Sequence, residues 1–214
     1  MKTILLLPVF FFALGAFAQN KQIEMTHYIF PEFQKSKVVM HAGGTNSPML
    51  NYNSLAEEMI FDTNGKKLAM DKLSDIDTIY IEGRIFVPYQ KKFIELIHHN
   101  LYELYAVHKC SLIDPGKPAA YGGTSQTSSS TSFSSFSSGG QLYELSLPEG
   151  YGTKPYTEYI LLKDGKYNSF LTIKQLSKLF EDQSVIFKEY TKSHKVKYEN
   201  QESIVELIQY LEQH

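Results

Sequence analysis

Apolar and polar positions alternate through most of residues 37–112, and this pattern predicts an antiparallel β-sheet. Short runs rich in Val, Ile, Leu, Phe and Tyr are separated at nearly even intervals by Gly, Asn and Asp, as in a β-meander. Asn64-Gly65 stands between two such runs and supplies the two positive φ angles that a type I′ turn requires. Glu82-Gly83 predicts a second tight hairpin. We therefore expect a meander over residues 19–114.

A second group of strands is predicted nearer the C-terminus. Asp164-Gly165 separates two apolar runs, at residues 156–162 and 167–171, in a strong hairpin pattern. Together with a strand-like stretch that starts at Gln141, these runs predict a returning β segment over residues 141–171 in the same domain as the meander.

Residues 115–140, which separate the two groups of strands, are dominated by Ser, Thr and Gly. A tract of this composition buries too little apolar surface to offset its ordering entropy, so it predicts a long loop. A sharper alternative is that Thr131 to Phe136 lies along the sheet edge, with Phe133 and Phe136 as anchors.

One stretch of the meander fits two structures. Residues 91–97 and 101–109 predict two strands joined at His98-His99-Asn100, but the apolar residues from Phe93 to Tyr105 also fit one helical face. The neighbouring strands favour the β interpretation. His99 and Asn100 both tolerate the left-handed conformation, which predicts a two-residue turn.

From Thr172 the apolar period changes to about 3.6, which indicates helices. Thr172 and Asn200 are placed to cap two of them, and three short helices are expected in a C-terminal helical subdomain, residues 172–214. Strands followed by helices predict an α+β fold, with the meander as an open barrel or sandwich-like sheet and the helices as a small cap.

The first 18 residues predict a secretory signal peptide, because Lys2 is followed by an apolar run that ends in Ala16-Phe17-Ala18. The run from Ile4 to Ala18 is shorter than the ~20 residues that cross a bilayer. We expect a mature chain that starts at Gln19, has no transmembrane segment, and is periplasmic or extracellular.

Charge and cysteine content narrow the possible partners. The 21 basic and 23 acidic residues are interspersed, which argues against nucleic acid and anionic membranes as partners. Cys110 is the only cysteine, so no intrachain disulfide forms and a lipid anchor on an N-terminal cysteine is not expected. Cys110 itself is interpreted as a small buried apolar residue.

The sequence resembles that of uncharacterised secreted proteins of the Bacteroidota. The resemblance is carried in the body by Leu50-Asn51-Tyr52-Asn53, Glu57 to Phe61, Gly65-Lys66-Lys67, Arg84 to Pro88 and Phe93 to Leu96, and in the tail by Leu179 to Asp182, Ile186 to Tyr190 and Glu202 to Ile208. It implies an exported envelope protein with no assigned chemistry, and it implies no functional residues.

Metal binding and catalysis have few candidates. His98, His99, His108 and Cys110 are the closest group of soft ligands, but the predicted hairpin separates His98 from His108, and two ligands on one strand face do not complete a zinc site. We therefore expect neither a metal nor a cofactor.

A hydrolase acting on envelope polymers remains an alternative. The serines of residues 125–138 lack a G-x-S-x-G context, and Glu57 and Glu58 are expected to alternate between the two faces of a strand. Neither group predicts a preorganised site.

Aromatic content supplies the remaining functional signal, since the chain has 15 Tyr and 14 Phe and no Trp. Tyrosines concentrate around the Ser/Gly-rich tract, and tyrosine is enriched at interfaces. The candidate binding residues are Tyr121, Phe133, Phe136, Tyr143, Tyr151 and Tyr156. We expect a non-catalytic binding protein that recognises protein or glycan, with a structural role in an envelope assembly as a further alternative and the oligomeric state left open.

Overall fold

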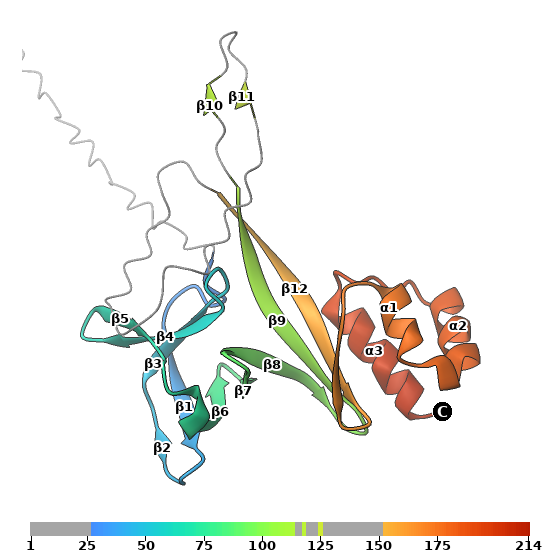
Figure 1. The fold of residues 1–214 in the computed structure, drawn as a ribbon, viewed down its shortest axis with the longest axis horizontal. Coiled ribbons are helices and arrows are strands. Elements are labelled where there is room, and N and C mark those ends of the chain that lie inside the picture. Colours follow the sequence, from blue (N-terminus) through green and yellow to red (C-terminus); the bar gives the residue numbers. More distant parts are fainter. Residues whose placement is uncertain (1–26, 114–116, 119–123, 126–151) are drawn as a thin grey trace, which may run out of the picture.

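The computed structural model describes residues 27–113, 117–118, 124–125 and 152–214. They form a largely antiparallel sheet with three α-helices packed at one end, which confirms the predicted α+β class (Figure 1). The predicted signal peptide, most of the Ser/Gly-rich tract and the strand expected from Gln141 lie outside the described residues. Within the described part, no helix has both the length and the apolarity needed to cross a bilayer.

Eleven strands share one sheet, in the order β13-β12-β9-β8-β7-β6-β1-β3-β4-β5, with β2 paired to β1. Their bounds are β1 Gln34–Met40, β2 Thr45–Asn46, β3 Met49–Asn53, β4 Glu58–Thr63, β5 Lys66–Ala69, β6 Ile76–Ile81, β7 Arg84–Tyr89, β8 Lys92–His99, β9 Glu103–Ile113, β12 Gly152–Lys163 and β13 Lys166–Phe170. Two further short strands, β10 (Lys117–Pro118) and β11 (Thr124–Ser125), pair with each other. From β6 to β9 the strands follow chain order, as the meander predicts, whereas β1 lies between β3 and β6.

The three tight hairpins form as the turn residues predict. Asn64-Gly65 has φ angles of 56° and 80°, Glu82-Gly83 has 48° and 75°, and Asp164-Gly165 has 53° and 70°. Two consecutive positive φ angles are the mark of the type I′ turn, whose twist matches that of the flanking strands.

The ambiguous stretch from Phe93 to Val107 is β structure, but its turn differs from the expected one. β8 ends at His99, which pairs with Glu103, so three residues form the loop. Neither His99 nor Asn100 has a positive φ angle, so the predicted two-residue turn is wrong. The wider loop turns the side chain of Tyr102 into the core, and this tertiary contact outweighs local turn preference.

The C-terminal helices are α1 (Ile173–Lys178), α2 (Ser184–Ser193) and α3 (Gln201–Glu212), with short 3-10 turns at η1 (Leu73–Asp75) and η2 (Glu181–Gln183). Both predicted caps are present, because the Thr172 hydroxyl accepts a hydrogen bond from the Gln175 amide and the Asn200 side chain accepts one from the Ser203 amide. Capping side chains satisfy amides that a helix start leaves unpaired.

The helices and one part of the sheet share a single apolar core. Leu104 and Ala106 of β9 and Leu161 of β12 pack in the same cluster as Leu207 and Leu211 of α3. A second core fills the other end of the sheet, and its buried residues are Phe30, Val38, Leu50, Tyr52, Met59, Ile76, Ile79, Ile81, Phe86 and Phe93. Burial of this apolar surface is the main stabilising contribution.

Strand alternation places both cores on one face of β8. Phe93, which belongs to the second core, and Glu95 share this face because side chains repeat every two residues. Ile97 lies in the register shift between Leu96 and His98 and packs against the first core. A third, smaller cluster of Ile94, Tyr105, Val107 and Ile160 occupies the opposite face.

Candidate functional site

Three tyrosines meet on the sheet face opposite the helices, and we call them the tyrosine cluster: Tyr89 of β7, Tyr105 of β9 and Tyr167 of β13. The ring of Tyr167 lies 5.0 Å from that of Tyr89 and 5.9 Å from that of Tyr105, measured between centroids. Tilted rings at these separations are favourable aromatic pairs.

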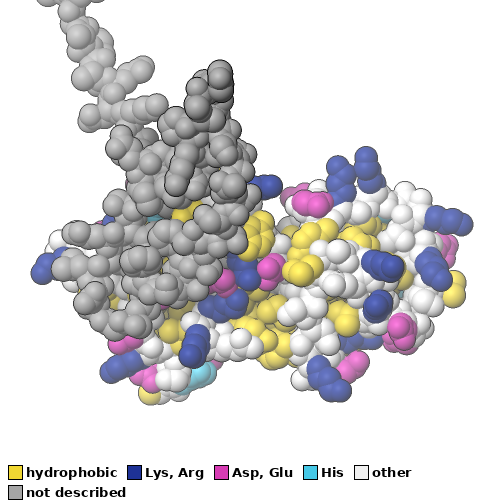
Figure 2. Space-filling view, turned by 45° about the horizontal axis from the view of Figure 1, so that its top comes forward, with side chains coloured by type: hydrophobic (Ala, Val, Ile, Leu, Met, Phe, Trp, Pro, Cys, Tyr) yellow, Lys and Arg dark blue, Asp and Glu magenta, His cyan; other side chains and the backbone are white. Residues whose placement is uncertain are grey.

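Strand register explains why distant tyrosines converge. Tyr105 pairs with Ile160, and Leu162 pairs with Tyr167, so these four residues point to one face of β9, β12 and β13. Their floor is the third apolar cluster, extended by the partly buried residues Val87, Leu96 and Leu162. In Figure 2 hydrophobic side chains gather in the middle of the molecule, between the helical end and the grey region.

The tyrosine cluster combines buried and accessible rings. Tyr105 is buried and donates its hydroxyl hydrogen to Glu103, whereas Tyr167 is 49% exposed. Burial, together with the Glu103 carboxylate, raises the pKa of Tyr105, so its hydroxyl stays neutral and acts as a donor. His99 Nδ1 lies 3.1 Å from the other oxygen of Glu103. The cluster therefore offers an accessible ring beside a fixed carboxylate.

Of the six candidate residues from the sequence, the structure describes only Tyr156, which is exposed on β12 and shares a face with Ile160. The other five, which are Tyr121, Phe133, Phe136, Tyr143 and Tyr151, lie outside the described residues. Tyr89 and Tyr105 were missed because their convergence depends on a pairing register that the sequence alone does not display.

A second polar group, the polar seam, consists of Arg84, Glu95 and His108 on three adjacent strands. Arg84 donates two hydrogen bonds to Glu95, from Nε to Oε1 at 2.6 Å and from Nη2 to Oε2 at 2.5 Å. His108 Nε2 lies 2.5 Å from the same Oε2. A carboxylate only accepts, so Nε2 of His108 bears the hydrogen, and Arg84 and His108 share one acceptor.

The polar seam occupies the boundary between the two large cores. Glu95 is 6% exposed, and the Arg84 guanidinium lies 5.3 Å from the ring of Phe30 and 5.4 Å from that of Phe86. Burial by itself would raise the pKa of Glu95, but hydrogen bonds and charge from Arg84 and His108 outweigh it, and the pKa is lowered. Glu95 is thus a charged, fully partnered carboxylate.

This geometry favours a structural over a catalytic role for the polar seam. General acid catalysis at neutral pH requires a carboxyl whose pKa is raised, the reverse of what holds for Glu95. Cys110 follows His108 by two residues on β9, but burial raises the pKa of its thiol, which disfavours the nucleophilic thiolate. The seam nevertheless brings together three polar groups that the sequence did not associate.

The structure separates the histidines of the predicted soft-ligand group, and His99 lies beside Glu103. His108 belongs to the polar seam, whereas His98 lies 2.9 Å from Glu212 at the end of α3. The described residues contain no group of three or more His, Cys, Asp or Glu side chains arranged to hold a metal ion.

The two carboxylates expected to alternate on a strand also occupy different settings. Glu57 precedes β4 with a φ of 58°, so its predicted strand position is wrong, while Glu58 begins the strand. The turn conformation lets Glu57 reach Lys92 of β8 at 2.5 Å and Lys109 of β9 at 3.7 Å. This ion-pair group joins the β3–β4 turn to β8 and β9.

Glu212 joins the last helix to the β8–β9 loop. Its oxygens accept hydrogen bonds from the Tyr102 amide at 2.9 Å, from His98 at 2.9 Å and from Asn100 at 3.1 Å. Burial would raise the pKa of Glu212, but these donors outweigh it and the pKa is lowered. The helical cap is therefore fixed to the sheet by a charged group as well as by the core.

Acidification is expected to destabilise the fold through Glu95 and Glu212. Because both pKa values are lowered on folding, their stabilisation is complete above the unfolded value, about 4.3, and is lost as the pH falls through the folded values. Urea unfolding between about pH 7 and pH 2 measures this slope.

The Glu212→Gln variant is the control for this prediction. It cannot titrate, so its free energy of unfolding should fall less steeply with acid than that of the wild type. An unchanged slope would show that the pKa of Glu212 does not change on folding.

Comparison with known proteins gives no match to a family model, to a curated protein or to a solved structure.

Proposed function

We propose that the protein is an exported, non-catalytic binding protein that holds a glycan on the tyrosine cluster. The observation that supports this most directly is the convergence of Tyr89, Tyr105 and Tyr167 on one sheet face beside the Glu103 carboxylate. Export is inferred from the N-terminal pattern of Lys2 and the apolar run that follows it.

Glycan recognition follows from the chemistry of these groups. A sugar ring has apolar C–H faces that stack on an aromatic ring, and hydroxyls that donate to a carboxylate or exchange hydrogen bonds with a phenol. Tyr167 provides an accessible ring, Tyr156 lies exposed farther along β12, and Glu103 provides the acceptor. Rigid strands hold these groups in place, which limits the ordering entropy lost on binding.

Hydrolysis of such a polymer is a weaker interpretation of the same structure. The polar seam is the best candidate for chemistry, and its carboxylate is already held by hydrogen bonds with Arg84 and His108. The site that the geometry supports best is therefore a binding surface.

Tyr167→Ala tests the proposal. The intact mature protein is first screened on a glycan array, and the affinity for each bound glycan is then measured by calorimetry. Loss of a central aromatic side chain should weaken binding by about 30-fold, the value for a hot-spot residue. Stability should change little, because Tyr167 is 49% exposed.

Tyr80→Ala is a matched control, since Tyr80 is similarly exposed at 41% but lies on β6, outside the tyrosine cluster. It should leave the affinity unchanged. Failure to bind any glycan, or equal affinity of the Tyr167→Ala variant, would refute the proposal. A protein that is pulled down by the wild type but not by the Tyr167→Ala variant would show that the ligand is a protein rather than a glycan.

A further inference from the structure

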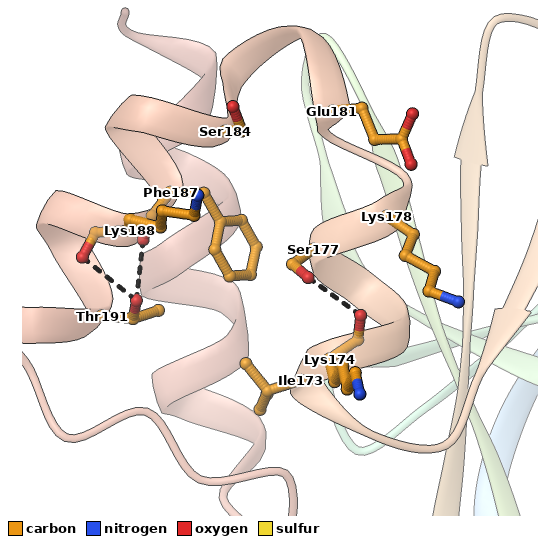
Figure 3. A pocket seen from close by; sticks show the side chains of 9 residues that line it. All are labelled: Ile173, Lys174, Ser177, Lys178, Glu181, Ser184, Phe187, Lys188 and Thr191. Carbon is orange, nitrogen blue, oxygen red and sulfur yellow. Dashed lines mark hydrogen bonds between the residues drawn. The ribbon is translucent and has the colours of Figure 1, made fainter.

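The outer side of the helical cap contains an open groove of ≈ 400 Å³ between α1 and α2 (Figure 3). Its lining residues are Ile173, Lys174, Ser177, Lys178, Glu181, Ser184, Phe187, Lys188 and Thr191. Helical spacing explains the set, because Ser184, Lys188 and Thr191 repeat along one side of α2, as do Lys174, Ser177 and Lys178 along α1.

The groove has an apolar floor. Phe187 projects from α2 between the two helices, and Ile173 lies at the lower end of the view (Figure 3). The hydroxyls beside them already donate to backbone carbonyls, from Ser177 to Lys174 at 2.9 Å and from Thr191 to Phe187 at 2.9 Å. Their hydrogens are thus satisfied within the helices, and the floor presents mainly hydrocarbon.

The rim of the groove is cationic and unneutralised. Lys174, Lys178 and Lys188 form no ion pair with any described carboxylate, in contrast to Lys163, which lies 3.1 Å from Asp182. With Glu181 as the only acidic lining residue, the net formal charge of the lining is 3 − 1 = +2. Figure 3 shows Lys188 reaching from α2 towards α1 beside Phe187.

We infer that this groove binds a small amphipathic acid, with the hydrocarbon part on Phe187 and Ile173 and the acidic group held by the lysines. Charge complementarity selects the anion, and the apolar floor selects a molecule with an aromatic or acyl body. The volume, ≈ 400 Å³, falls within the roughly 300–1,000 Å³ of small-molecule sites, which favours a compact ligand over a polymer.

This site is independent of the proposed glycan surface. The helices pack on the face of β9 that presents Leu104 and Ala106, whereas Tyr105 points to the opposite face. Failure of either proposal leaves the other unaffected.

Titration with anilinonaphthalene sulfonate, a fluorescent aromatic anion, tests the inference on the intact mature protein. We expect saturable binding that weakens as salt is added, since screening reduces attraction between exposed charges. The double variant Lys174→Glu, Lys188→Glu should bind the probe on the order of tenfold more weakly, because attraction is replaced by repulsion. Amide chemical-shift changes should concentrate on α1 and α2.

Three controls make the result decisive. The Lys72→Glu variant changes an exposed lysine directly before η1, outside the helical cap, and should bind as the wild type does. The uncharged analogue phenylnaphthylamine should bind more weakly than the sulfonate, and far-UV circular dichroism should show that the double variant is folded. Equal binding by the folded double variant, equal binding of the neutral probe, or shift changes elsewhere would each overturn the inference.

Discussion

Replacing Glu95 by Gln is expected to lower the free energy of unfolding by about 3 kcal/mol, the low end of the range for breaking a buried ion pair. The substitution removes the charge that compensates Arg84 inside the boundary between the two cores. The low end applies because the Arg84 side chain remains 28% exposed and recovers part of its hydration. Urea unfolding near pH 7, followed by circular dichroism, measures the loss.

The matched comparison is the double variant Arg84→Met, Glu95→Leu. Removing both partners leaves no uncompensated guanidinium, so this variant should be more stable than Glu95→Gln alone although it lacks the whole Arg84–Glu95 ion pair. If Glu95→Gln instead lowers the free energy of unfolding by less than about 1 kcal/mol, the polar seam contributes no more than a weak surface ion pair.

Phe180→Ala is expected to cost about 3–5 kcal/mol, as truncation of a fully buried phenylalanine usually does. Its ring lies 5.3 Å from that of Tyr102 in the β8–β9 loop and 6.4 Å from that of Phe187 in α2. The cavity would therefore weaken the contact between the helical cap and the sheet. Since one core joins the two, helix and aromatic signals should be lost in a single transition.

Val185→Ala is the control, because Val185 is an exposed residue of α2 and the change should stay within about 0.5 kcal/mol. Two separate transitions in the Phe180→Ala variant, with helix lost first, would instead show that residues 172–214 unfold as an independent unit.

Local sequence signals predicted the hairpins and helix starts well. Asn64-Gly65 and Asp164-Gly165 favour the positive φ angles that they adopt, and Thr172 and Asn200 bear the oxygens that cap their helices. Such features depend on a few neighbouring residues, so a single chain displays them. The three-residue loop at Tyr102 did not follow local preference, because its shape is set by the core and by Glu212.

The candidate sites were harder to predict because they are created by pairing between strands. Arg84, Glu95 and His108 stand 11 and 13 residues apart in the chain and meet only when β7, β8 and β9 align. Alternation did predict that His108 and Cys110 share a face, but not that His108 contacts Glu95 of the neighbouring strand. The sequence therefore identifies which residues share a strand face, whereas the partners across strands follow from the register.

The central position of β1 has a consequence for shortening or tagging the protein. Among the described strands, β1 alone joins the β3–β5 ribbon to β6 through backbone pairing, with only Gln34 and Lys35 facing β3. A deletion that extends through Met40 would leave β3 and β6 as two unpaired edge strands. Unpaired edges pair with strands of other molecules, so the N-terminally truncated protein should aggregate rather than remain as a smaller folded domain.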